Sequence, residues 1–162
     1  MEYEHLFEAL WKERIRSLLC GGLAVNIYGI PRMTADVDLL LDFEKENLNR
    51  FEHVLKKLSY SPVIPLPVSQ LSDKARRIEL VKEKNMIVYS FYSSRSNFMS
   101  VDVLLDPPFT FESLWEKREV RSLNKYEVNL VSLPQLIEMK SFANRKQDQD
   151  DVILLSKLLG NK

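Results

Sequence analysis

The sequence has one cysteine, two histidines and no formal net charge, and each of these features narrows the class of protein. The single cysteine, Cys20, cannot form a disulfide within the chain and suits a reducing cytoplasm. Lysine plus arginine equals aspartate plus glutamate, at 23 each, so the chain has no bulk attraction to nucleic acid or to an anionic membrane. A local basic patch would still be enough for a polynucleotide partner such as RNA.

Long apolar runs are also missing. No run approaches the roughly 20 residues that cross a membrane, and the beginning, MEYEHLFEAL, is acidic and lacks the basic region of a signal peptide. We therefore expect a cytoplasmic chain with no membrane partner. The 162 residues, 45% of them apolar, suit one domain over residues 1–162 with a substantial core. One of the two histidines, His5, has no second ligand at metal-binding spacing and is expected at the surface.

The informative residues are concentrated in the stretch 20–42, CGGLAVNIYGIPRMTADVDLLLD. Val37 and the leucines that follow predict a buried strand. Side chains alternate along a strand, so Asp36 and Asp38 point to the same side with their Cα atoms about 6–7 Å apart. Two neighbouring carboxylates repel each other and lose solvation unless a cation satisfies them. A hard divalent metal, Mg²⁺ or Mn²⁺, is the ligand that this arrangement favours.

A glycine pair precedes the carboxylates. Gly21 and Gly22 end the apolar run at residues 15–20, which predicts a core strand, and open a short helix at residues 23–28. Glycines at this point let the backbone come close to a ligand, and the helix start offers free N–H groups to phosphate. Taken alone, the pair can be a plain turn and the Asp-x-Asp a solvated strand edge.

Together, with thirteen residues between Gly22 and Asp36, the two features resemble the nucleotidyltransferase superfamily with its DNA polymerase β-like fold. The superfamily signature is a strand, Gly-Gly or Gly-Ser, a helix, and a strand that carries Asp-x-Asp or Asp-x-Glu. The form Arg32-x-Thr34-x-Asp36-x-Asp38 is most similar to small prokaryotic members, which include antibiotic nucleotidyltransferases and abortive-infection toxins. The resemblance implies an α/β (α+β) fold, with a mixed twisted sheet flanked by helices and a C-terminal helical pair.

A third carboxylate stands in a later strand. Residues 86–92 and 99–105 read as two strands of a hairpin joined by a polar turn at residues 93–97. Asp102 lies between Val101 and Val103, where an ionised carboxylate is costly without a partner. The resemblance implies that Asp102 is the family's third carboxylate, on a strand beside the one that carries Asp36 and Asp38.

The C-terminal part adds a cation. Ser132, Pro134 and Gln135 predict a helix start, followed by helices to about Ala143 and over residues 148–159. Residues 140–151 resemble the family pattern Lys-x-x-Ala…Arg-x-Lys-Asp-x-x-Asp, although Gln147 stands where a lysine is expected. The resemblance implies that Lys140 contacts nucleotide phosphates. The alternative is a solvated helix lysine.

The remaining segments complete the predicted fold. We expect amphipathic helices over residues 2–13 and 44–58, an extended proline-rich connector over 61–67, and a charged stretch over 69–84 that is helical at its start. Thr110 is expected to cap a short helix through Trp115, and residues 120–123 and 126–131 to pair about a turn at Asn124.

By resemblance, the chain is a Mg²⁺-dependent nucleotidyltransferase that uses a nucleoside triphosphate. Arg32 either reaches the triphosphate or pairs with an acid and orders its loop, and Thr34 caps or supports the carboxylates.

The acceptor is open among a small molecule, a protein and an RNA 3′ end. The sequence specifies neither the nucleobase nor the oligomeric state. The alternatives are a lapsed nucleotide-binding domain of the same fold and a domain that binds metal only for structure. The expected metal ligands are Asp36, Asp38 and Asp102, and the expected nucleotide-binding residues are Gly21, Gly22, Arg32, Thr34 and Lys140.

Overall fold

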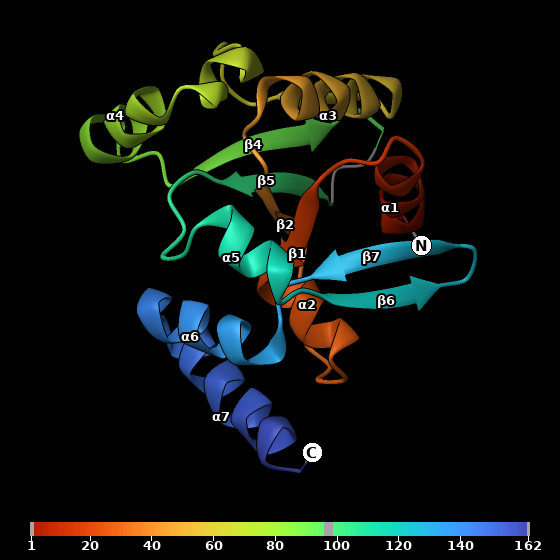
Figure 1. Ribbon diagram of the computed structural model, residues 1–162, viewed down its shortest axis with the longest axis vertical. Coiled ribbons are helices and arrows are strands. Elements are labelled where there is room, and N and C mark those ends of the chain that lie inside the picture. The colour runs from red at the N-terminus through yellow and green to blue at the C-terminus, as the bar shows by residue number, and fades with distance from the viewer. Residues whose placement is uncertain (1, 96–98, 162) are drawn as a thin grey trace.

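A mixed seven-stranded sheet organises the computed structural model, which describes residues 2–95 and 99–161 (Figure 1). The strand order across the sheet is β3-β4-β5-β2-β1-β7-β6. The strands are β1 (Ser17–Cys20), β2 (Asp36–Leu41), β3 (Tyr60–Pro62), β4 (Val88–Ser93), β5 (Ser100–Leu104), β6 (Glu119–Leu123) and β7 (Tyr126–Leu130). The helices are α1 (Glu2–Lys12), α2 (Gly21–Ile27), α3 (Lys45–Lys57), the 3₁₀ helix η1 (Val68–Ser72), α4 (Lys74–Lys84), α5 (Phe111–Glu116), α6 (Leu133–Ala143) and α7 (Lys146–Gly160).

The centre of the sheet is the pair β1–β2, which is antiparallel and joined by α2. On its outer side β2 runs parallel to β5, and β5 pairs antiparallel with β4 as the predicted hairpin. On the other side β1 runs parallel to β7. The mixed sheet flanked by helices that the sequence predicts is confirmed, and the strand that carries Asp102 lies directly beside the strand that carries Asp36 and Asp38.

The two faces of the central strands differ in what covers them. Leu19 and Leu39 face α1, whose side chains Phe7 and Leu10 pack over them. Helix α3 packs on the same face farther along, where Phe51 meets Phe91 of β4 with ring centroids 5.8 Å apart. Because side chains alternate, Asp36 and Asp38 lie on the opposite face, toward α6. The fold therefore buries one face of β2 in the core and presents the carboxylates on the other.

The helices α2, α6 and α7 gather at the end of the sheet where β2 begins (Figure 1). Helix α7 packs against α6, and the predicted C-terminal helical pair is confirmed. The cap at its start differs from the prediction, because the Ser132 hydroxyl meets the Gln135 side chain at 3.0 Å and makes no cap hydrogen bond to the backbone. Proline at the first turn supplies the start signal instead.

The segment 59–84 is where the sequence reading is least accurate. Its connector includes the short edge strand β3, which a proline at the sheet edge permits. The start of the charged stretch is helical as predicted, but as the 3₁₀ helix η1, and an α-helix that was not predicted, α4, occupies its second part. Asp73 explains this position, because its carboxylate accepts the N–H groups of Ala75 and Arg76 and caps α4.

Other predicted elements agree closely. Thr110 caps α5 by accepting the Ser113 N–H, and the pair β6–β7 turns at Asn124, which has a positive φ of 55°. The predicted turn at residues 93–97 lies partly outside the described residues. No helix in the described part of the chain has the length and apolar character needed to cross a membrane.

Candidate active site

Three carboxylates come together through the register of β2 and β5. Asp36 pairs with Ser100, and Asp38 pairs with Asp102. Paired residues on neighbouring strands project to the same face about 5 Å apart, so Asp102 joins the side of the sheet that Asp36 and Asp38 already share. The structure thus brings together the three carboxylates that the sequence singled out.

Neither β2 nor β5 carries a lysine or arginine that could balance the negative charge of these carboxylates. The pKa of Asp38 is raised to about 6, mainly by burial and then by the charges of Asp102 and Asp36, whereas the backbone N–H of Gly22 and the charge of Lys140 oppose the shift. Burial also raises the pKa of Asp102. Such raised values mean that the ionised carboxylates repel each other in the folded chain, which is the electrostatic condition that a bound cation relieves.

Two hydroxyl groups support Asp102, and the sequence reading missed both. The Ser100 hydroxyl lies 2.8 Å from Asp36 Oδ1 and 3.4 Å from Asp102 Oδ1. Ser90, which pairs with Asp102 across β4 and β5, donates a hydrogen bond that lowers the pKa of Asp102 against the effect of burial. Ser100 could have been found, because it stands two residues before Asp102 in the same strand. Ser90 could not, because its position depends on the hairpin register.

The glycine pair is packed against these carboxylates. Gly21 has a positive φ of 66°, and a β-carbon built on it would overlap the Asp38 carboxylate. Gly22 donates its N–H to Asp38, and a β-carbon there would lie 2.9 Å from the Thr34 hydroxyl. The pair is therefore more than a plain turn, since both positions need a residue without a side chain.

Cys20, the residue before the glycines, is fully buried beside Asp38. Its thiol donates to the Asp38 carbonyl oxygen at 3.4 Å. Burial, with the Asp38 charge, raises the pKa of the thiol well above its usual range, so Cys20 is a protonated, packed side chain rather than a nucleophile.

Arg32 and Thr34 lie in the segment that leads into β2. Arg32 forms an ion pair with Asp151 of α7, which is the loop-ordering role that the sequence left open. Its Nε atom is buried with no hydrogen-bond partner in the described part of the chain, and the guanidinium lies against Gly22. Thr34 donates to the carbonyl oxygen of Asp36 at 3.3 Å and so supports the start of the carboxylate strand.

Lys140 is the central member of a buried chain of charges. Its Nζ lies 2.7 Å from Asp151 Oδ2 and 3.2 Å from Asp148 Oδ1. Arg32 binds the same Asp151, and Arg145 Nε lies 2.7 Å from Asp148. The Lys140 side chain is only 7% exposed, so the alternative of a solvated helix lysine is wrong. The chain of charges fastens α6 and α7 to the segment before β2.

A small cavity of about 100 Å³ adjoins both Asp38 and these cations. Its lining includes Asp38 and Gly21 together with Lys140, Arg145 and Asp148. Arg145 is the solvent-exposed cation of this group, since its side chain is 81% exposed. An anion that entered the cavity would meet the positive charges of Lys140 and Arg145 as well as the carboxylates of Asp38 and Asp148.

The sequence matches a known protein family over most of its length. The family described as "Nucleotidyl transferase AbiEii toxin, Type IV TA system" matches residues 4–151. The chain belongs to the AbiEii nucleotidyltransferase family, and it is a nucleotidyltransferase. None of the curated proteins matches the chain in sequence.

A solved structure supports the fold of this AbiEii-family chain. The structure titled "Crystal structure of lincosamide antibiotic adenylyltransferase LnuA, lincomycin-bound" is similar with a TM-score of 0.63 and 13% sequence identity. The similarity covers 96% of this chain and 94% of the other, so the two share nearly their whole architecture. At this identity the similarity establishes a common fold, the nucleotidyltransferase fold that the sequence predicted.

The carboxylates of this AbiEii-family chain suit a metal that the substrate helps to bind. In the described residues, no three side chains of His, Cys, Asp or Glu form a complete metal site. Mg²⁺ commonly takes one or two carboxylates and completes its shell with water and substrate phosphates. The mutual repulsion around Asp38 fits this mode, because a cation would be attracted strongly without a full protein cage.

Proposed function

We propose that this chain transfers a nucleoside monophosphate from a nucleoside triphosphate to a hydroxyl group of an acceptor and releases pyrophosphate. The observation that carries the proposal is the pairing of Asp38 with Asp102, with the glycine turn packed against Asp38. The family supports nucleotidyl transfer in general. The direction of transfer and the roles of individual residues are our inference from the site.

Asp36, Asp38 and Asp102 would hold Mg²⁺ or Mn²⁺ together with the phosphates. The bound metal would supply Lewis acidity and charge neutralisation at the reacting phosphate. The acceptor oxygen forms a bond to the α-phosphorus, and the bond from that phosphorus to the β-phosphate bridging oxygen breaks. The proton of the acceptor hydroxyl passes to Asp102.

The triphosphate would lie between the glycine turn and the cations of α6 and α7. Gly21 and Gly22 leave room for it, and Arg32 has a buried Nε without a protein partner beside Gly22. Thr34 supports the same segment. Lys140 lines the same small cavity as Asp38 and provides positive charge although two aspartates hold it.

The acceptor remains open among a small molecule, a protein and an RNA 3′ end, and the expected compartment is the cytoplasm. LnuA is titled as an antibiotic adenylyltransferase, whereas the matched family is described as a toxin family. The second candidate is a nucleotide-binding domain of this fold that has lost catalysis. The retained trio of carboxylates, of which Asp38 and Asp102 are half-buried, favours catalysis, because a lapsed site has no physical need to keep such charges.

The test is binding followed by transfer. Thermal unfolding is measured with Mg²⁺ alone and with Mg²⁺ plus ATP, GTP, CTP or UTP, for the wild type, Asp38→Asn and the exposed control Asp150→Asn. A nucleotide at 100 times its dissociation constant adds about 2.7 kcal/mol, a shift of roughly 5–10 °C for a chain of this size.

We expect one or more nucleotides to raise the midpoint in the wild type and in Asp150→Asn, but not in Asp38→Asn. The stabilising nucleotide, labelled at the α-phosphate, then identifies acceptors by label transfer from cell extract. Stabilisation without any transfer would favour the lapsed domain, and stabilisation by Mg²⁺ alone would favour a structural metal.

A further inference from the structure

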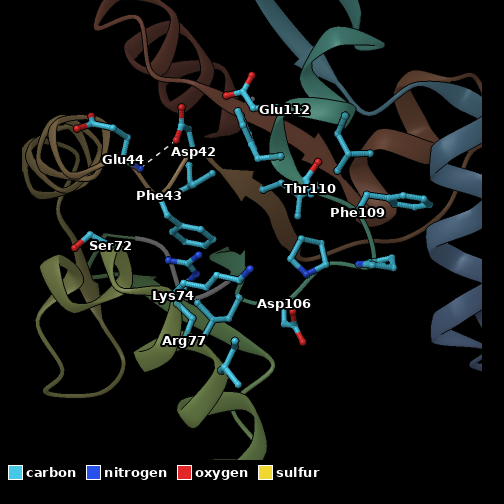
Figure 2. A pocket seen from close by; sticks show the side chains of 18 residues that line it. Asp42, Phe43, Glu44, Ser72, Lys74, Arg77, Asp106, Phe109, Thr110 and Glu112 are labelled. Carbon is cyan, nitrogen blue, oxygen red and sulfur yellow. Dashed lines mark hydrogen bonds between the residues drawn. The ribbon is translucent and has the colours of Figure 1, made fainter.

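A hollow of about 630 Å³ opens at the far ends of β2 and β5, between α4 and α5 (Figure 2). Its volume lies within the roughly 300–1,000 Å³ that is typical of small-molecule sites. The three carboxylates are not part of its lining. Asp42, which does line it, follows Asp38 by four residues, or about 13 Å along an extended chain. The proposed catalytic residues therefore leave this hollow unexplained.

The floor of the hollow is aromatic. Phe43, Phe109 and Phe111 line it, and none of the three is fully buried. Two of these rings are held by neighbours, since Phe111 stacks on Trp115 at 5.6 Å and Phe109 meets Phe142 edge-on at 6.4 Å. Rigid aromatic surfaces that stay partly open favour a ligand with a planar ring.

One wall of the hollow is cationic. Lys74 and Arg77 stand one turn apart in α4, and Figure 2 shows both side chains next to the ring of Phe43. The Arg77 guanidinium lies 4.1 Å from the Phe43 ring centroid. Neither residue forms an ion pair with any carboxylate in the described part of the chain, although Asp73 and Asp106 act on Arg77 from a distance. Arg77 also donates a hydrogen bond to the Leu71 carbonyl oxygen, so Lys74 is the less engaged of the two cations and both keep positive charge at this wall.

Three acids on the other side of the hollow have partners, although only two of them form an ion pair. Asp42 and Glu112 both pair with Arg16, at 3.1 Å and 2.6 Å. Glu44 accepts the N–H groups of Glu46 and Asn47 and so caps α3. Asp106 also lines the hollow, is exposed and forms no ion pair in the described part of the chain, so the lining carries both signs of charge. Its positive charge is confined to the wall formed by Lys74 and Arg77, and that wall favours the anionic part of a ligand.

We propose that this hollow binds a second ligand in which a planar ring is joined to a phosphate group, as in a mononucleotide. The ring stacks against Phe43 and Phe109, and the phosphate lies between Lys74 and Arg77. Leu40 and Leu41 line the hollow at the end of β2 that lies away from Asp36, so the ligand is separated from the proposed catalytic site and uses none of its residues. The inference goes beyond the proposed function and does not depend on it.

Calorimetry in EDTA tests the proposal, because chelation removes the metal that the donor site needs. The probes are AMP, adenosine and inorganic phosphate. The variants are Lys74→Glu, the control Lys82→Glu on the same helix outside the hollow, and Asp38→Asn. All three positions tolerate the change without loss of core packing, since both lysines are exposed and the aspartate variant keeps its shape.

We expect AMP to bind at least tenfold more tightly than adenosine or phosphate. Lys74→Glu should weaken AMP binding at least tenfold, whereas Lys82→Glu and Asp38→Asn should change it less than twofold. Absence of AMP binding, equal binding by Lys74→Glu, or loss of binding in Asp38→Asn would overturn the proposal. A failure of the proposed transfer reaction would leave these results unchanged, so the two proposals fail separately.

A further titration tests whether the ligand is a free nucleotide or the phosphorylated end of an RNA chain. A short single-stranded RNA with a terminal phosphate is titrated beside AMP, again with the wild type and Lys74→Glu. Binding of AMP as tight as that of the RNA indicates a free nucleotide. RNA binding that is at least tenfold tighter and equally sensitive to Lys74→Glu indicates a chain end.

Discussion

The Asp38 carboxylate lies directly against the α-carbon of Gly21, so closely that a β-carbon at residue 21 would overlap it. Gly21 also has a φ of 66°, a conformation that side chains disfavour. The close approach seats the carboxylate at the first turn of α2, where the neighbouring Gly22 donates its N–H to it. One glycine thereby fixes both the backbone turn and the place of a proposed metal ligand.

Gly21→Ala should therefore lose both stability and nucleotide binding. The left-handed conformation costs about 1–2 kcal/mol in a residue with a side chain, and the overlap moves Asp38 in addition. Gly29→Ala is the matched control, because Gly29 has a φ of 102° but nothing within 4 Å of an added β-carbon. Thermal unfolding and nucleotide titration should show destabilisation in both variants and weaker binding only in Gly21→Ala. Equal nucleotide binding by the two variants would contradict the role assigned to the contact.

Asp38→Asn should abolish transfer while it preserves the fold. The variant removes one of three repelling charges and keeps the shape of the side chain, so in EDTA at pH 8 it should unfold at a higher temperature than the wild type. Added Mg²⁺ and nucleotide should reverse this order, because only the wild type gains from binding. The measurement is the unfolding midpoint with and without ligands, beside Asp150→Asn. Turnover equal to that of the wild type would remove Asp38 from the mechanism.

Local patterns in the sequence were enough to predict the proposed catalytic strand. The alternation of Asp36 and Asp38 with apolar residues defines both the strand and the shared side of the carboxylates, and it depends only on neighbouring residues. The glycine pair was likewise visible, although the overlap with Asp38 was not. Asp102 came from the family resemblance, since strand pairing between residues 38 and 102 leaves no local signal.

The charge chain of α6 and α7 shows where sequence reading stops. Arg32 and Asp151 are separated by 119 positions, and nothing in either segment specifies the other as its partner. The helical spacing of Leu136, Lys140 and Ala143 places them on one side of α6, but the burial of Lys140 depends on how α7 folds back. The same limit applies to the hollow, because Phe43, Lys74 and Phe109 come from separate elements. Long-range packing decides all of these features.

Lys140→Ala should weaken nucleotide binding at least tenfold and also lower stability. The change leaves Asp148 and Asp151 without their shared buried cation, and removal of one partner from such a group typically costs about 3–5 kcal/mol. Lys146→Ala is the control, since Lys146 is exposed at the start of α7. Nucleotide affinity is measured well below the unfolding midpoint of the variant, so that only folded protein is compared. A stability loss with unchanged affinity would assign Lys140 to structure alone.

The contribution of Asp148 to stability should depend on pH in a defined direction. Burial alone would raise its pKa, but the hydrogen bond from Arg145 and the charge of Lys140 outweigh burial and hold the pKa below its ordinary value of 3.8. A carboxylate whose pKa is lower in the folded state stabilises the fold above its unfolded pKa, and this stabilisation disappears as the pH falls through the folded pKa. Asp148→Asn should therefore cost stability at pH 7 and progressively less below about pH 4.

Urea unfolding of the wild type, Asp148→Asn and Asp150→Asn between pH 7 and pH 2.5 measures this dependence. We expect a difference of about 3 kcal/mol between the wild type and Asp148→Asn at pH 7, because the substitution leaves Lys140 short of one buried partner. That difference should narrow at acid pH, while Asp150→Asn stays close to the wild type throughout. A difference that stays constant down to pH 2.5 would mean that the shape of the side chain, and not its charge, holds α7 to Lys140 and Arg145.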